Sequence, residues 1–141
     1  MKRRSFINKC CVSLLGFSAV APLLTGCPAK AVRHTKVEIS PNNELIVRQS
    51  VFIKDRYVLL QHPDNKFLIC IYKSMRGKYF ATLMECTHQS CATDIVAKHI
   101  ICPCHGSRFV MNGDVIKGPA TENLKTFITR AEGDFVYIAL G

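Results

Sequence analysis

Glycine and proline are scarce in this chain, and acidic residues are absent from its first 27 positions. The 141 residues include only 8 Gly and 6 Pro, which excludes collagen-like and low-complexity sequences. With 48% hydrophobic and 21% charged residues, the composition also excludes a disordered chain. There is no internal repeat and no amphipathic helix of convincing length. We therefore expect one folded domain of roughly 100 residues, which is too small for a two-domain enzyme.

The segment Met1–Cys27 has the features of an export signal and not of a folded domain. Lys2, Arg3, Arg4 and Lys9 precede an apolar stretch, Cys10–Gly26, that is short for a permanent membrane-spanning helix. The net charge of the whole chain is +9. We interpret residues 1–27 as an export signal, 28–35 as a tether and 36–141 as the folded domain.

Two short patterns within this segment are more specific. Arg3-Arg4-Ser5-Phe6-Ile7 resembles a twin-arginine export signal, and Leu24-Thr25-Gly26-Cys27 resembles a bacterial lipobox, in which the cysteine is acylated and becomes the new N-terminus. The alternatives are an ordinary Sec signal with adjacent basic residues and an uncleaved membrane anchor. Either way the sequence predicts an exported domain on the periplasmic side of a membrane, tethered by lipid at Cys27 or by an N-terminal anchor.

The remainder of the chain is organised as short runs rich in β-branched and aromatic residues. Turn sequences such as Asn112-Gly113 separate several of these runs, and this dipeptide supplies the positive φ angles of a tight hairpin between Arg108–Met111 and Asp114–Lys117. Many short strands at this spacing predict an all-β fold, an antiparallel sandwich or barrel. The other predicted strands are Glu44–Arg48, Tyr57–Gln61, Lys66–Tyr72, Lys78–Met84, Val115–Lys117, Thr126–Thr129 and Phe135–Leu140.

Cysteine and histidine are concentrated in two boxes. The first is Cys86-Thr87-His88-Gln89-Ser90-Cys91 and the second is Cys102-Pro103-Cys104-His105-Gly106-Ser107. Two thiols and two imidazoles suit either a tetrahedral zinc or an iron–sulfur cluster with mixed ligands. A plain zinc site would leave two of these cysteines without a role.

The two boxes together strongly resemble those of the Rieske [2Fe–2S] proteins, in the disulfide-containing branch found in cytochrome bc complexes. The resemblance implies one [2Fe–2S] cluster, with Cys86 and Cys102 on one iron and His88 and His105 on the other. It also implies a Cys91–Cys104 disulfide between the two loops, in a small cluster-binding subdomain over about 84–120.

Four further positions are matched to family positions by the same resemblance. Gly118 and Pro119, in Gly118-Pro119-Ala120, match the loop that shields the cluster. Ser107 matches a residue whose hydroxyl donates to a cluster sulfur, and Phe109 stands where high-potential members often have Tyr.

The expected chemistry agrees with the expected compartment. Replacing two thiolates by neutral imidazoles raises the reduction potential, to about −150 to +300 mV against about −400 mV for four-Cys clusters. A structural disulfide requires an oxidising compartment, whereas the cluster is inserted before export. A twin-arginine route, which moves folded proteins, satisfies both requirements.

The sequence thus predicts an exported, membrane-tethered electron carrier and no catalytic acid–base residues. An enzymatic activity would belong to an oxidoreductase complex of which the chain is a subunit. The expected partners are a redox donor, either a quinol or an oxidoreductase subunit, and an acceptor such as a cytochrome; no motif indicates nucleic-acid binding. The alternatives are a structural zinc domain that mediates binding, and the ferredoxin component of an oxygenase.

Overall fold

The structure is a computed structural model, and it describes residues 37–141. The predictions for the export signal, for Cys27 and for the tether lie outside these residues. Among the described residues, no helix has the length and apolar character needed to cross a membrane.

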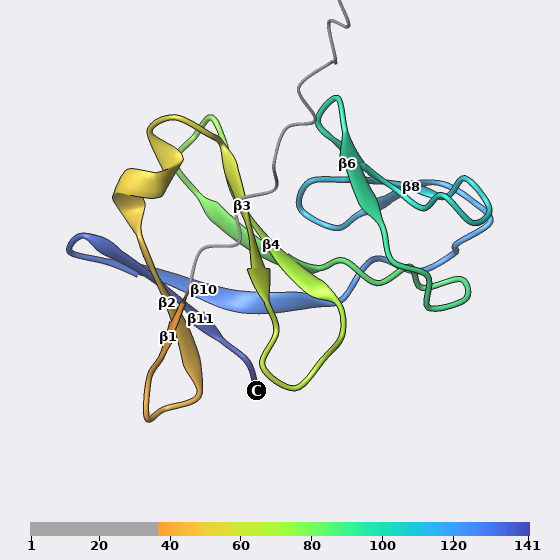
Figure 1. Cartoon of the computed structure of the whole chain (residues 1–141). Coiled ribbons are helices and arrows are strands. Elements are labelled where there is room, and N and C mark those ends of the chain that lie inside the picture. The colour runs from red at the N-terminus through yellow and green to blue at the C-terminus, as the bar shows by residue number, and fades with distance from the viewer. Residues whose placement is uncertain (1–36) are drawn as a thin grey trace, which may run out of the picture. The chain divides into compact units, whose positions relative to one another are not determined.

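The larger part of the fold is a seven-stranded antiparallel sheet, which curls around an apolar core (Figure 1). Its strands lie in the order β1-β2-β11-β10-β5-β4-β3. A short 3-10 helix, η1 (Gln49–Phe52), connects β2 to β3. The bounds are β1 Glu38–Ile39, β2 Glu44–Arg48, β3 Tyr57–Gln61, β4 Leu68–Lys73, β5 Tyr79–Leu83, β10 Thr126–Glu132 and β11 Phe135–Ala139.

These strands are short runs rich in β-branched, aliphatic and aromatic residues, which favour extended backbone, and burial alternates along them. In β2, Leu45 and Val47 are buried while their neighbours are more exposed, and β11 repeats the pattern with Val136 and Ile138. Because successive side chains of a strand point to opposite faces, each strand contributes every second residue to the core. The core of this sheet also contains Phe52, Val58, Leu60, Phe67, Ile69, Ile71, Tyr79, Ala81, Leu83 and Phe127.

A smaller four-stranded sheet follows β5 in the chain. It is a meander of β6 (Asp94–Val96), β7 (His99–Ile101), β8 (Arg108–Val110) and β9 (Val115–Lys117). Ile100 and Phe109 are cross-strand partners and are fully buried. They belong to a second apolar cluster with Cys70, Met84, Cys86, Cys102, Met111, Ala120 and Leu124.

Strand β4 serves both apolar clusters. Ile69 and Ile71 face the core of the large sheet, whereas Cys70, between them, belongs to the second cluster. All three side chains are completely buried. The strand therefore has no solvent-facing side along this stretch, and it joins the two halves of the domain.

The structure confirms the all-β fold, and it adds three strands that the sequence analysis missed. These are β1, β6 and β7, each of only two or three residues. The predicted hairpin of Arg108–Met111 with Asp114–Lys117 forms as β8 and β9, but the turn differs from the prediction. Of the two turn residues, only Gly113 has a positive φ, at 96°. The Val110 carbonyl accepts a hydrogen bond from the Gly113 N–H, and this closes a type I-like turn whose last residue is left-handed.

Candidate metal centre

The two cysteine–histidine boxes form loops with the same backbone framework. In the first loop the Cys86 N–H donates to the Cys91 carbonyl at 2.8 Å, and the Ser90 N–H donates back to the Cys86 carbonyl at 2.9 Å. In the second loop the Cys102 N–H donates to the Ser107 carbonyl at 2.9 Å, and the Gly106 N–H donates to the Cys102 carbonyl at 3.0 Å. The fifth residue of each loop is left-handed, with φ of 50° at Ser90 and 78° at Gly106. One loop design is thus used twice, although the histidine occupies the third position in one loop and the fourth in the other.

Because Ser90 and Gly106 occupy equivalent left-handed positions, exchanging their residue types should change the free energy of unfolding in opposite directions. Ser90→Gly should raise the free energy of unfolding by about 1 kcal/mol, because a left-handed conformation disfavours a residue with a Cβ. Gly106→Ser should lower the free energy of unfolding by a similar amount. A Cβ on Gly106 would meet no atom within 4 Å, so the cost comes from the backbone alone. Thermal unfolding of both variants beside the wild type tests the pair, and shifts of the same sign would contradict it.

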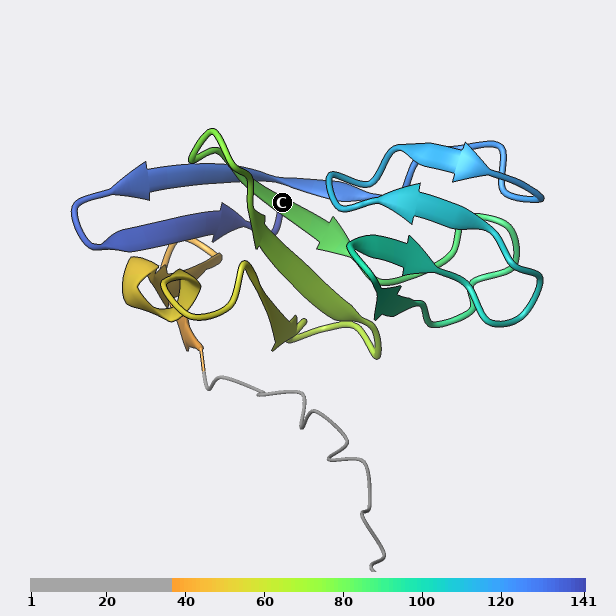
Figure 2. The same ribbon diagram turned by 90° about the horizontal axis from the view of Figure 1, so that it is seen from above.

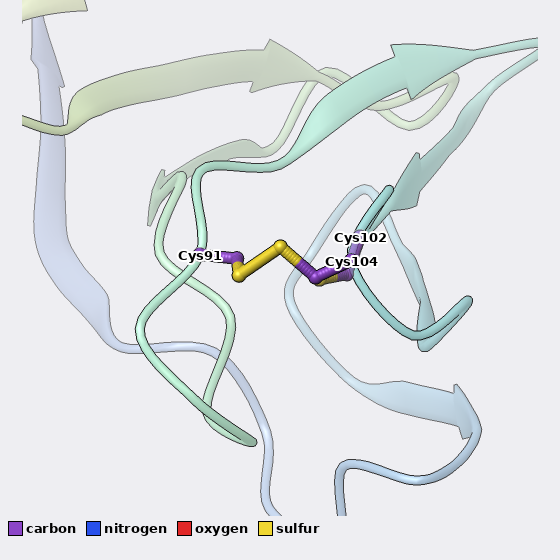
Figure 3. Close-up of side chains that lie close together, drawn as sticks. All are labelled: Cys91, Cys102 and Cys104. Atoms are coloured by element: carbon purple, nitrogen blue, oxygen red, sulfur yellow. A yellow bond between two sulfur atoms is a disulfide. The ribbon is translucent and has the colours of Figure 1, made fainter.

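A disulfide joins the loops, as the resemblance implies. Cys91 and Cys104 are bonded, with their Cα atoms 6.6 Å apart (Figure 3). The sulfur atoms of Cys91, Cys102 and Cys104 lie within 4.8 Å of one another, which by itself suggests a three-thiol metal site. Two of these sulfurs are used by the disulfide, so Cys102 is the member of this group with a free thiol.

The second free thiol at the centre belongs to Cys86. Cys86 and Cys102 are both buried, with 1% of each residue exposed. Burial is the largest cause of a raised pKa of the Cys86 thiol, and the neighbouring Cys102 raises this pKa further. Hydrogen bonds from the His88 backbone and the Ser107 side chain act in the opposite direction. A buried thiol whose pKa is raised in this way, as at Cys86, becomes a thiolate readily only when a cation binds to it.

The two imidazoles of the boxes lie at the surface of the centre. His88 and His105 are both exposed, and their ring centroids are 5.1 Å apart with the planes nearly perpendicular. The structure therefore brings together all four predicted ligands, with the thiols inside and the imidazoles outside.

A third segment, which contains Gly118 and Pro119, is hydrogen-bonded to both loops. The Ala120 N–H donates to the Ser107 hydroxyl oxygen at 2.9 Å, and the Thr87 hydroxyl donates to the Glu122 carbonyl at 2.8 Å. Because the Ser107 hydroxyl oxygen accepts a hydrogen bond from the Ala120 N–H, its own hydroxyl hydrogen is available for a hydrogen bond to the Cys86 sulfur. The role of Thr87 was not predicted from the sequence, where a hydroxyl between a cysteine and a histidine is the only signal for it.

The residues present fit a two-metal group in which one metal has thiolate ligands and the other has imidazole ligands. A single tetrahedral ion treats its ligands alike, whereas here the donors are divided by depth into two buried thiols and two exposed imidazoles. The remaining free cysteine among residues 37–141, Cys70, is fully buried in β4 and is not part of the centre. Burial raises the pKa of its thiol to about 12, as expected for an inert packing residue.

Comparison with known sequences agrees with this geometry. A family model described as the Rieske [2Fe–2S] domain matches residues 35–128. The cytochrome b6-f complex iron–sulfur subunit of Chlorobaculum thiosulfatiphilum is 28% identical over 98% of this chain and 75% of its own length. The corresponding subunit of Chlorobaculum tepidum is 29% identical over 99% of this chain and 76% of its own length.

Solved structures give the same result. The plasma membrane Rieske protein PetC3 of the cyanobacterium Synechocystis matches with a TM-score of 0.57 and 26% identity, over 64% of this chain and 93% of that protein. A ferredoxin of Sphingomonas yanoikuyae matches with a TM-score of 0.53 and 25% identity, over 70% of this chain and all of that protein. Naphthalene 1,2-dioxygenase, at 20% identity and a TM-score of 0.58, shares the fold.

Proposed function

This chain belongs to the Rieske [2Fe–2S] family and is an electron-transfer protein with one [2Fe–2S] cluster. We propose that the buried thiols and the exposed imidazoles of the centre bind different irons of this cluster. Cys86 and Cys102 bind the inner iron, and His88 and His105 bind the outer iron. The observation that carries this assignment is the burial of both thiols beneath two exposed imidazoles 5.1 Å apart.

The surrounding residues each contribute to holding this group. The disulfide fixes the spacing of the two loops, and the segment around Pro119 covers the side that neither loop covers. The Ser107 hydroxyl donates to the Cys86 sulfur, which withdraws electron density from the inner iron. When bound, the cluster supplies reversible one-electron chemistry at a potential above that of four-Cys clusters. The exposed imidazoles leave one side of the centre open to a partner.

The partners we propose follow from the relatives. Two cytochrome b6-f complex iron–sulfur subunits align with nearly the whole of this chain, at 28% and 29% sequence identity. We therefore propose that the chain takes electrons from a quinol-oxidising or related respiratory partner and passes them to a cytochrome, as a subunit or partner of a membrane complex. The oxygenase-ferredoxin alternative is disfavoured by the disulfide, since that branch generally lacks it.

A redox titration of the purified protein across pH tests this function. We expect one-electron behaviour at a midpoint within about −150 to +300 mV, with visible colour and acid-labile sulfide. Colourless protein that contains zinc without sulfide would select the structural zinc alternative. A midpoint that is low and independent of pH would favour the ferredoxin alternative.

The hydroxyl of Ser107 should tune the midpoint. Ser107→Ala removes the hydrogen bond to Cys86 and should lower the midpoint on the order of 50–100 mV, since 59 mV is a tenfold change for one electron. Phe109→Tyr should raise the midpoint by a similar or smaller step if the buried ring keeps its position. Protein-film voltammetry of both variants at one pH measures the shifts. An unchanged midpoint in Ser107→Ala would show that this hydroxyl does not act on the cluster.

The export route that we propose rests on residues 1–27. Cys27→Ala should abolish acylation and precursor processing, which mass spectrometry of the membrane fraction detects. Arg3→Lys combined with Arg4→Lys should leave cluster-loaded protein in the cytoplasm. Normal export of the double-Lys variant with its cluster would refute the twin-arginine interpretation.

A further inference from the structure

Three loop tips of the domain carry large apolar side chains that are exposed to solvent. Ile53, after η1, is 86% exposed; Met75, in the β4–β5 hairpin, is 79% exposed; and Val96, at the β6–β7 turn, is 51% exposed. None of these side chains belongs to either apolar cluster. A single exposed apolar residue is ordinary, but three on neighbouring tips suggest an interaction surface.

The three tips point the same way. They lie along the upper edge of the domain in Figure 1, and Figure 2 looks down on that edge. The backbone ties the first two together, because the Lys73 N–H donates to the Arg56 carbonyl at 2.8 Å. We call these segments, 53–56, 74–78 and 96–99, the three-loop face.

The backbone holds two of the tips in tight turns. The β6–β7 turn has Ala97 and Lys98 at positive φ, 46° and 71°, directly after Val96. In the β4–β5 hairpin, Gly77 has a φ of 79° and its N–H donates to the Ser74 carbonyl at 3.0 Å, with Met75 between. Met75 and Val96 are therefore presented by short, constrained turns.

The charge on the three-loop face differs in sign from the charge on the rest of the domain. Residues 37–141 contain twelve Lys and Arg and ten Asp and Glu. The three-loop face has five of these cations and one acid, Asp55, which leaves seven cations and nine acids elsewhere. The cations of the face are Lys54, Arg56, Arg76, Lys78 and Lys98.

We propose that the three-loop face binds the surface of an anionic lipid bilayer. Ile53, Met75 and Val96 enter the boundary between headgroups and acyl chains, and the five cations contact lipid phosphates. Apolar side chains surrounded by Lys and Arg are the composition that interfacial membrane binding requires, since the long basic side chains keep their charges at the headgroup level. Anionic lipids attract each cation within about one Debye length of the surface.

The short stretch of chain between Cys27 and the folded domain limits how far the domain can move from a bilayer to which Cys27 is anchored. Cys27 lies ten residues before Val37, and ten residues span at most about 36 Å. A domain acylated at Cys27, as proposed above, is thus confined to the neighbourhood of a bilayer. The metal-binding loops lie at the right-hand end of Figure 1, away from the upper edge, so this contact leaves the imidazoles accessible to a partner.

Hydrogen–deuterium exchange of the full-length, cluster-loaded protein in lipid nanodiscs tests the proposal. Nanodiscs that contain phosphatidylglycerol should slow exchange in segments 53–56, 74–78 and 96–99 by ~tenfold relative to pure phosphatidylcholine. Ile53→Glu combined with Met75→Glu should abolish this difference. The matched control is Ile128→Glu, at a side chain 80% exposed on β10, which should preserve it.

Three outcomes would overturn the proposal. The first is equal exchange in the two lipids, and the second is loss of protection in Ile128→Glu as well. The third is protection that appears only when an acidic redox partner is added, which would assign the face to a protein. The visible spectrum of the cluster, recorded on the same samples, should be unchanged in all variants, so a failure here is distinguishable from a failure of the redox function.

Discussion

Cys86→Ser and His105→Ala should each yield protein that lacks the visible absorption and the paramagnetic signal of the [2Fe–2S] cluster. Cys86 is one of two buried thiols at the centre, and the serine hydroxyl that replaces it does not ionise at neutral pH. In the proposed assignment His105 is one of two imidazoles for the outer iron, so alanine would leave that iron with a single protein ligand. Iron and acid-labile sulfide analysis with electron paramagnetic resonance of the reduced protein measures the loss.

Cys70→Ser is the matched control for these variants. Cys70 is a buried thiol in the same apolar cluster as Cys86 and Cys102, but it lies on β4 and takes no part in the loops. We expect it to keep the full cluster signal, with some loss of stability because a hydroxyl replaces a thiol in an apolar site. If Cys70→Ser lost the cluster and His105→Ala kept it, the ligand assignment would be wrong.

Removal of the disulfide should give the largest loss of stability that leaves the ligands intact. Cys91 and Cys104 are 13 residues apart in sequence, and a closed loop of that length contributes about 3 kcal/mol in the chain-entropy model. Cys91→Ala combined with Cys104→Ala should therefore lower the Tm by roughly 10–15 °C. The temperature at which the cluster-loaded protein loses its visible colour provides the measurement.

The double variant is preferable to either single one. Replacing only Cys91 would leave a free Cys104 whose sulfur lies within 4.8 Å of Cys102 and could pair with it. A Tm equal to that of the wild type would mean that hydrogen bonds to the segment around Pro119 hold the loops without the disulfide.

The sequence was sufficient to predict most of the strands, and the structure brings together the four residues that the sequence analysis named as candidate ligands. Strands such as Glu44–Arg48 and Tyr57–Gln61 were predicted with their observed bounds, because short runs of β-branched, aliphatic and aromatic residues between polar residues are visible in the sequence. The hairpin of β6 and β7 was missed, because Ala97 and Lys98 take positive φ angles that their residue types do not indicate. The ligand assignment and the N-terminal tether stay predictions until they are measured.

The shared framework of the two metal-binding loops could not be predicted for a different reason. It is made of backbone hydrogen bonds, and the side chains at equivalent positions differ, with Cys91 in one loop where Ser107 stands in the other. The same holds for the contacts of Thr87 and Ala120 with Glu122 and Ser107, which join segments far apart in the chain. Such contacts depend on tertiary folding and leave no periodic signal.

Because β4 contributes to both apolar clusters, it determines how cooperatively the domain should unfold. Because Ile69 and Ile71 pack into one cluster and Cys70 into the other, neither cluster can lose its packing while this strand keeps its place in the sheet. The half that carries the two cysteine–histidine loops is therefore not a separate folding unit, and both apolar clusters should lose their packing in a single transition, at the same temperature whichever cluster is monitored. A deletion that removed only β6–β9 would leave the outer face of β4 bare, and we would expect the remaining sheet to aggregate through it.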